Sequence, residues 1–235
     1  MTILEDFLKT HDAGALLDIA CGGGAFTKRL TENLKSYTSV LGLDIKAESS
    51  DGFFEAVKGH DISFISASIH DYLETADAFD TVSVSNALHH LEGVGEVLKD
   101  VRNILNEGGT FIINEMHCDN LTPSQQTQRD QHKFLADLQR AAGEYHRETW
   151  SRSEILEFVA NAGLRIQHTY ENANEDAPIT KEPDRMVERA QTAIEKAYPA
   201  GAPNSVNTER DRLAARSSEI GSSPPPQLTL VCIGA

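Results

Sequence analysis

The chain has 235 residues, of which 40% are hydrophobic and 24% charged, and its formal net charge is −15 at pH 7. This size and composition allow one domain with a substantial core, and no apolar stretch reaches the roughly 18–20 residues of a membrane-spanning helix. The acidic balance disfavours a broad nucleic-acid interface, because phosphate backbones would be repelled. Three widely spaced cysteines and an acidic N-terminus without a leader pattern predict a cytoplasmic protein without disulfides.

The first half of the chain alternates strand-like apolar runs with helical patterns. A short helix is expected over residues 3–11. Strands are expected over 16–20, 40–45, 62–66 and 79–85, with helices over 25–34 and 48–57 between them. Alternation of this kind indicates βαβ units and a parallel sheet.

The second half continues the pattern with longer helices. Apolar residues at helical spacing predict helices over 94–105, 123–142 and 151–162, and strands are expected over 110–114, 164–170 and 227–233. Gly108 and Gly109 turn the chain into the fifth strand. Ser151 and Glu154 form a capping box that starts one helix, and Gly163 is the expected C-cap.

Residues 172–226 do not fit the alternating pattern. Helical stretches over 185–198 and 209–220 are bounded by Pro, Gly and Ser. Long connections of this kind are usually functional or disordered. We expect a helical insertion within a single domain spanning 1–235, which either covers part of a substrate pocket or forms a dimer surface; the alternative is a loose, solvated excursion.

Two acidic strand ends and a glycine run suggest a nucleotide-type site. The first strand leads from Asp18 into Gly22–Gly24, and the second ends at Asp44. Glycine lets backbone lie close to a ligand, and the helix that follows presents free N–H groups. A carboxylate at the end of the next strand can bind ribose hydroxyls.

These strings resemble motifs of a known family. DIACGGG at 18–24 and LGLD at 41–44 resemble the first two motifs of class I S-adenosylmethionine (SAM)-dependent methyltransferases. Three later strings resemble the same family's fourth strand, fifth strand and last strand, in the same order: FDTVSVSNALHHL at 79–91, VLKDVRNILNEGGTFIINE at 97–115 and QLTLVCIGA at 227–235. The resemblance implies an α/β fold. It would be a Rossmann-like, mostly parallel seven-stranded sheet with helices on both faces, the last strand antiparallel and a helical insertion between strands six and seven.

The resemblance also implies SAM as cofactor. The glycine run would hold the carboxypropyl and sulfonium part, and Asp44 would accept both ribose hydroxyls. Asp18 would orient the turn or reach the methionyl amine through water, and Asn86 would contact the methionyl portion or the sulfonium side. The implied cofactor-binding residues are Asp18, Ala20, Cys21, Gly22, Gly24, Asp44, Ile45, Ser68, Ile69 and Asn86.

Departures from the family pattern bear on this site. Ala20 replaces the first motif glycine, so we expect an unstrained φ there. Ser68 stands where the family often has an acid that contacts adenine, so recognition would use its hydroxyl, backbone groups or a shifted Asp71. NAD is the competing cofactor, but its G-x-G-x-x-G motif would need a glycine at Thr27.

Methyl transfer needs alignment more than a fixed set of catalytic residues. A general base is required only if the acceptor must lose a proton. His89 and His117 follow strands four and five and are the candidate bases, with ordinary polar contacts as the alternative. Tyr145, His146 and Trp150 either line the pocket or anchor the next helix. His117, Cys118, Asp119, His132 and His146 are suitable metal ligands but lack a known ligand spacing, so no metal is expected.

The sequence therefore predicts methyl transfer from SAM to a small-molecule acceptor by in-line displacement. No [DNS]-P-P-[FWY] motif follows the fourth strand, which weighs against methylation of adenine or of a glutamine amide. Two alternatives remain: a SAM-binding regulator or scaffold without turnover, and a protein or RNA methyltransferase. Nucleic acid and membrane are not expected partners, whereas a homodimer is possible.

Overall fold

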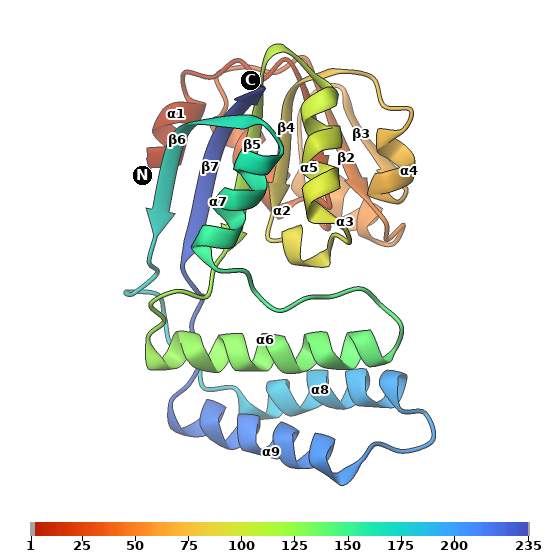
Figure 1. Ribbon diagram of the computed structural model, residues 1–235, viewed down its shortest axis with the longest axis vertical. Helices are drawn as coiled ribbons and strands as arrows, with labels where there is room; N and C mark the ends of the chain where they lie inside the picture. Colours follow the sequence, from red (N-terminus) through yellow and green to blue (C-terminus); the bar gives the residue numbers. More distant parts are fainter. Residues whose placement is uncertain (1–2, 235) are drawn as a thin grey trace.

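A seven-stranded sheet forms the centre of the computed structural model, which describes residues 3–234 (Figure 1). Its strand order is β3-β2-β1-β4-β5-β7-β6. The strands are β1 (Ala15–Ile19), β2 (Ser39–Asp44), β3 (Ile62–Ser66), β4 (Phe79–Ser85), β5 (Leu105–Met116), β6 (Leu164–Asn172) and β7 (Gln227–Gly234). Only β7 pairs antiparallel with its neighbours, β5 and β6, among these strands. The predicted fold class is confirmed.

Helices pack on both faces of the sheet. The larger apolar cluster joins the sheet to the helices seen in front in Figure 1, and a smaller one joins it to α1 and α2 behind. The helices around the sheet are α1 (Ile3–Leu8), α2 (Ala25–Asn33), α3 (Ser49–Ala56), α4 (Ile69–Leu73), α5 (Val94–Asn103), α7 (Arg152–Asn161) and the short 3-10 helix η1 (Leu88–His90). Burial on both faces explains why β1 and β4 in the centre of the sheet carry buried apolar or small polar side chains at nearly every position.

Three further helices form a separate layer, which we call the three-helix cover. It consists of α6 (Pro123–Ala141), α8 (Pro183–Ala197) and α9 (Asn204–Glu219). Their apolar faces meet in a cluster of their own that includes Phe134, Leu138, Ile194 and Leu213. Figure 1 shows this layer across the end of the sheet toward which β6 runs. Strands β1 to β5 run toward the same end, because β5 and β6 are both antiparallel to β7. Ligands bind at that end of open α/β sheets.

Several predicted boundaries shift in the structure. The fifth strand begins at Leu105, not at 110, because Leu105 already pairs with Phe79 before a register shift that contains Gly108 at φ +76°. The last cover helix, expected from 209, begins at Asn204, directly after Pro203. The short helix α4 was not predicted at all, since five residues are too few for a periodic pattern.

Local capping fixes the helices that flank the ligand-binding end. Ser151 and Glu154 form the predicted capping box of α7. Thr122 and Gln125 form a second capping box at α6, which was not predicted from the sequence.

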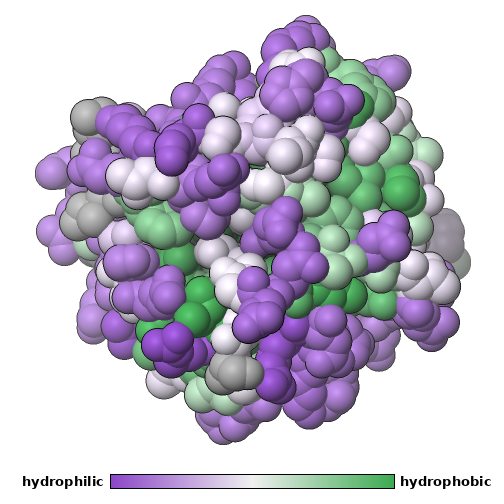
Figure 2. All heavy atoms as spheres, turned by 90° about the horizontal axis from the view of Figure 1, so that it is seen from above, coloured by the Kyte–Doolittle hydropathy of each residue, from purple (hydrophilic) through white to green (hydrophobic). Residues whose placement is uncertain are grey.

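The opposite end of the molecule is shown in Figure 2, where hydrophilic side chains predominate and hydrophobic ones gather in smaller areas between them. Among the described residues, no helix combines the length and apolar character needed to cross a bilayer.

Candidate functional site

The glycine turn, Gly22–Gly24, connects β1 to α2 and is tied to the end of β2. The backbone N–H of Gly22 donates to Asp44 Oδ2 at 2.8 Å, and that of Lys46 donates to Asp44 Oδ1 at 2.9 Å. The Asp44 carboxylate, at the tip of β2, thus lies directly beside the turn. Cβ atoms added at Gly22 and Gly23 would meet no heavy atom within 4 Å, whereas one at Gly24 would lie 2.9 Å from the Val57 side chain.

Asp18 lies beneath the turn and not on a cavity wall. Its carboxylate is 1% exposed and accepts hydrogen bonds from the hydroxyl of Thr27 on α2 and, at 2.6 Å, from Ser83 on β4. Burial raises the pKa of Asp18 to about 6, although the two hydroxyl donors act in the opposite direction. The contacts with α2 and β4 fit the first role expected for this residue, which was to orient the turn.

Ala20 corrects one expectation. Its φ is +51°, in the left-handed region that favours glycine, although an unstrained φ was predicted. The prediction was wrong because it assumed that an alanine at this position has a negative φ. The tight path from β1 into Gly22 instead imposes a glycine-like conformation on Ala20. A left-handed alanine costs roughly 1–2 kcal/mol. Cys21, the next residue, donates its N–H to the Leu43 carbonyl at 3.1 Å and so links β1 to β2.

A cavity of about 220 Å³, the Asp44 cavity, opens beside β2. It brings together predicted residues from three strand ends: Ala20, Asp44, Ile45, Ser68 and Ile69. The side chain of Ile45 is 72% exposed, an unusual state for a large aliphatic residue, and offers a flat apolar surface to a ligand. The Ser68 hydroxyl accepts the His70 N–H at 3.3 Å as the N-cap of α4.

A second space of about 1060 Å³, the covered cavity, lies between the sheet and the three-helix cover. Ile45 and His90 line both this cavity and the Asp44 cavity, so the two adjoin. One wall is formed by residues at or just after the ends of β2, β4 and β5: Ile45, Lys46, Glu48, Asn86, His89, His90 and Met116. The other wall is formed by α6, the segment after it and α8: His132, Leu135, Leu138, Gln139, Ala142, Glu144, His146, Arg189, Thr192, Ala193 and Lys196.

His89, one of the two predicted bases, lies on this wall and is 2% exposed. Its Nδ1 lies 3.2 Å from Oε1 of Glu115, which is fully buried. Glu115 also accepts the backbone N–H groups of Leu88 at 2.8 Å and Met116 at 3.0 Å. This carboxylate therefore fixes the orientation of the His89 ring.

Two distant histidines join His89 in a histidine cluster made of His89, His132 and His146. The Nε2 atoms of His132 and His146 lie 3.1 Å apart, and the ring of His89 is centred 4.8 Å from His132 and 5.3 Å from His146. Burial lowers the pKa of His132 to about 4 and that of His146 to about 3, with neighbouring histidines and arginines adding to the effect. Both rings are therefore neutral at pH 7.

The other predicted base lies elsewhere. His117 is 2% exposed, its Nε2 lies 3.4 Å from Glu171 on β6, and its Nδ1 lies 3.6 Å from Asp119. It lines none of the cavities described here. The structure thus does not bring His89 and His117 together. Of the aromatic stretch after α6, His146 lines the covered cavity, while Trp150 is buried in the main core.

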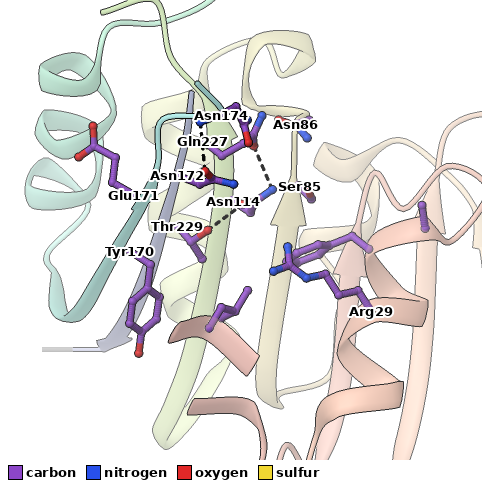
Figure 3. Close-up of a pocket in the computed structure, with 13 residues that line it drawn as sticks. Arg29, Ser85, Asn86, Asn114, Tyr170, Glu171, Asn172, Asn174, Gln227 and Thr229 are labelled. Carbon is purple, nitrogen blue, oxygen red and sulfur yellow. Dashed lines mark hydrogen bonds between the residues drawn. The ribbon is translucent and has the colours of Figure 1, made fainter. Parts of the chain in front are cut away.

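A third cavity, of about 630 Å³, lies between α2 and the ends of β4, β5, β6 and β7. Figure 3 shows its polar floor, where Asn114 donates to Ser85 at 2.9 Å and accepts from Thr229 at 2.8 Å. Asn86 lines both this cavity and the covered cavity. Its φ of +48° gives a turn directly after β4.

Sequence reasoning did not foresee how the covered cavity is assembled. His132 and His146 were considered as metal ligands, but their convergence on His89 depends on α6 crossing the sheet. Arg189 was missed because α8 belongs to the insertion, and the sequence does not show where the insertion docks. The helical spacing of Met186, Ala190 and Ile194, all buried, marks the face of α8 that packs within the cover, and Arg189 lies beside that face.

Comparisons with known proteins agree with this geometry. Residues 17–113 match the family model described as a methyltransferase domain. A mitochondrial ubiquinone biosynthesis O-methyltransferase from Rattus norvegicus is 29% identical over an alignment of 126 residues. The alignment covers 47% of this chain and 36% of the relative. The chain spans about a third of the length of the curated relatives it matches.

Solved structures resemble the whole chain at low sequence identity. A SAM-dependent methyltransferase from Geobacter sulfurreducens, solved with S-adenosyl-L-homocysteine, has a TM-score of 0.58 at 14% identity, covering 99% of this chain and 89% of that one. A cyclopropane-fatty-acyl-phospholipid synthase-like protein from Lactobacillus casei has a TM-score of 0.65 at 13% identity, covering 93% and 84%. These similarities show the fold of the chain, and the match to the methyltransferase-domain model covers residues 17–113, which include the glycine turn and Asp44.

Proposed function

We propose that this protein transfers a methyl group from SAM to a small-molecule acceptor held in the covered cavity. The observation that carries the proposal is the junction of two cavities at Ile45 and His90. The Asp44 cavity has the carboxylate and the exposed apolar side chain that an adenosine requires. The covered cavity begins where the sulfonium end of such a ligand would point.

The residues act mainly by positioning. Asp44 would accept the ribose hydroxyls, each charge-assisted bond contributing roughly 1.5–3 kcal/mol, while Ile45 packs against the base. The glycine turn would hold the amino-acid tail against its backbone and the first turn of α2. The three-helix cover would keep water out and hold the acceptor in line, and alignment of this kind can lower the barrier by about 7–11 kcal/mol.

Several features favour a small acceptor over a macromolecule. The covered cavity is bounded by the sheet on one side and by α6 and α8 on the other, which leaves little room for a polymer. Its charged lining residues are of both signs: Lys46, Glu48, Glu144, Arg189 and Lys196. The chain as a whole carries a net charge of −15, which disfavours an RNA substrate.

Calorimetric titration with SAM and with S-adenosylhomocysteine tests the first half of the proposal. We expect both to bind, and Asp44→Ala to weaken binding by about 10–150-fold, the equivalent of one such hydrogen bond. Asp51→Ala is the matched control, since Asp51 is an exposed acid on α3 outside the cavities described. Absence of binding to the wild type, or equal affinities for both variants, contradicts the proposed cofactor site.

Methyl-labelled SAM incubated with a metabolite mixture tests the second half. Label recovered in a small molecule supports the proposal. Label recovered only in added protein or RNA supports a macromolecular acceptor instead. Tight SAM binding without transfer to any of the three supports a regulatory or scaffolding role.

A further inference from the structure

The histidine cluster has the form of a metal-binding site. His89 comes from η1 at the end of β4, His132 from α6, and His146 from the segment between α6 and α7. One ring nitrogen from each lies within 4.8 Å of the others. His89 and His146 are buried and His132 is half-buried. Three imidazoles on separate segments do not pack together for apolar burial alone, because each ring carries nitrogens that require partners.

The hydrogen bonds on the outer side of the cluster support this interpretation. Nδ1 of His89 faces Glu115 Oε1, and Nδ1 of His146 faces the side-chain oxygen of Gln139. A ring that donates its Nδ1–H in this way presents an unprotonated Nε2 on the other side. Metal-binding histidines are typically held by a carboxylate or carbonyl oxygen at the second nitrogen.

The inner side of the cluster is poorly satisfied by protein groups. Nε2 of His132 contacts only Nε2 of His146, and its Nδ1 is buried without a hydrogen-bond partner. When Nδ1–H of His146 donates to Gln139, Nε2 of His146 carries a lone pair, so either a proton on Nε2 of His132 or a cation lies between the two Nε2 atoms. An ion at this position would give all three rings a common partner.

We propose that His89, His132 and His146 bind one divalent transition-metal ion, with Zn²⁺ as the best-suited ion. Three imidazole nitrogens and one open position are a common zinc arrangement, with Zn–N distances of about 2.0–2.1 Å. Tetrahedral nitrogens at that distance lie about 3.3 Å apart. The His132–His146 pair already meets this value, and the widest separation must shrink by about 1.5 Å, which side-chain rotations can supply.

The surrounding charges define what would complete the site. The positive charge of Arg189 on α8 acts on His132, that of Arg140 on α6 acts on His146, and that of Lys46 acts on His90 beside them. Glu115 and Glu144 are the nearby acids. Because three neutral rings leave the full charge of the ion unbalanced and basic side chains surround it, the fourth ligand is expected to be an anionic oxygen from the covered cavity.

Such an ion would supply Lewis-acid activation. A hydroxyl bound to a divalent ion would release its proton to water more readily, without a protein base. Its oxygen would then form a bond to the methyl carbon of SAM while the methyl–sulfur bond breaks and S-adenosylhomocysteine leaves. This role rests on the proposed methyl transfer, whereas metal binding itself does not. The two can therefore fail separately.

The experiment uses the full chain without a histidine tag, stripped with a chelator and titrated with ZnCl₂ in a calorimeter. We expect one Zn²⁺ per chain. His132→Ala and His146→Ala should each weaken binding by more than about 100-fold, and Glu115→Gln, which keeps the size of the orienting side chain but removes its charge, by about 10–100-fold. His60→Ala is the matched control, because this exposed histidine stacks on Tyr37 outside the cluster. Co²⁺ should give the intense visible absorption of a tetrahedral site in the wild type and in His60→Ala only.

Folding is monitored separately, by circular dichroism and by titration with S-adenosylhomocysteine. Variants that retain both but lose zinc and the cobalt spectrum support the metal site. Wild-type protein that binds cofactor without binding zinc overturns it while leaving the proposed function intact. Equal zinc affinity in His132→Ala and His60→Ala also overturns it, since binding would then occur elsewhere.

Discussion

The glycine turn and the histidine cluster lie at the same edge of the sheet but are built in different ways. The turn and Asp44 come from two successive βα connections, and the hydrogen bond between them spans 22 residues. The cluster joins η1 to α6 and to the segment after it, and the cavity around it is closed by α8 from the insertion. The first region is encoded locally, whereas the second depends on how the three-helix cover docks.

These two modes of construction determine which parts of the site can vary independently. The turn is held by the sheet's own register and by buried groups such as Asp18. The cover has its own apolar cluster and meets the sheet mainly around cavities. Cofactor binding should therefore tolerate changes in the cover, and acceptor binding should not.

The strongest change should come from the core of the cover. Leu213 on α9 is fully buried in the three-helix cluster, so Leu213→Ala should lower the free energy of unfolding by about 2–5 kcal/mol. Ser218→Ala, at an exposed position of the same helix, should stay within about 0.5 kcal/mol of the wild type. Urea unfolding measures both. Affinity for S-adenosylhomocysteine should be unchanged in folded Leu213→Ala, and a parallel loss would show that the two regions are coupled.

A second pair of variants separates packing from ligand contact within the glycine turn. Gly24→Ala combines a φ of +78° with a Cβ 2.9 Å from Val57, so a loss of roughly 2–4 kcal/mol in unfolding free energy is expected. Gly23→Ala meets no protein atom within 4 Å and should leave stability nearly unchanged. It should still weaken S-adenosylhomocysteine binding at least tenfold, measured by calorimetry. Normal binding by Gly23→Ala would show that the ligand does not lie against the turn.

Asp18 should make stability depend on pH in a direction unusual for an acid. Its pKa is about 6 in the folded protein, against 3.8 for an unperturbed aspartate, so the folded state holds the proton more tightly. The stabilisation from this proton is thus complete below pH 4 and is lost as the pH rises to about 6. It amounts to up to about 3 kcal/mol in the free energy of unfolding. Asp18→Asn removes this contribution, so its stability relative to the wild type should rise across that interval. Urea unfolding at each pH measures the free energy of unfolding of both proteins. If the two free energies changed with pH in parallel, Asp18 would not take up a proton on folding.

The mildest change should occur at Ala20. Because its φ is +51°, Ala20→Gly should relieve strain and stabilise the protein by about 0.5–1 kcal/mol, even after the greater freedom of glycine in the unfolded chain. The same substitution at Ala25, in the first turn of α2, should instead destabilise by up to about 1 kcal/mol. Thermal unfolding of the two variants should therefore shift in opposite directions.

The sequence was sufficient for the sheet because each strand is a short apolar run next to a helical pattern. It also placed Asp44, Ile45 and Ser68 near one another, since parallel strands end at a common edge. It could not give the φ of Ala20, which is imposed by the path of the turn, nor the early start of β5, which depends on pairing with Phe79. The approach of His132 to His89 is likewise invisible in sequence, because no local spacing encodes how α6 crosses the sheet.

The points at which the insertion joins the sheet govern how this fold can change. Asn172 and Gln227 are register partners at the tips of β6 and β7, so the chain leaves and re-enters the sheet at adjacent points. Everything between them could be exchanged for another segment or a short hairpin without altering the order of strands. The α6 face that carries Phe134 and Leu138 would need new covering, and Thr127 would need a new partner in place of Arg216. Such an exchange would replace the wall of the covered cavity that α8 provides while leaving the lining of the Asp44 cavity in place.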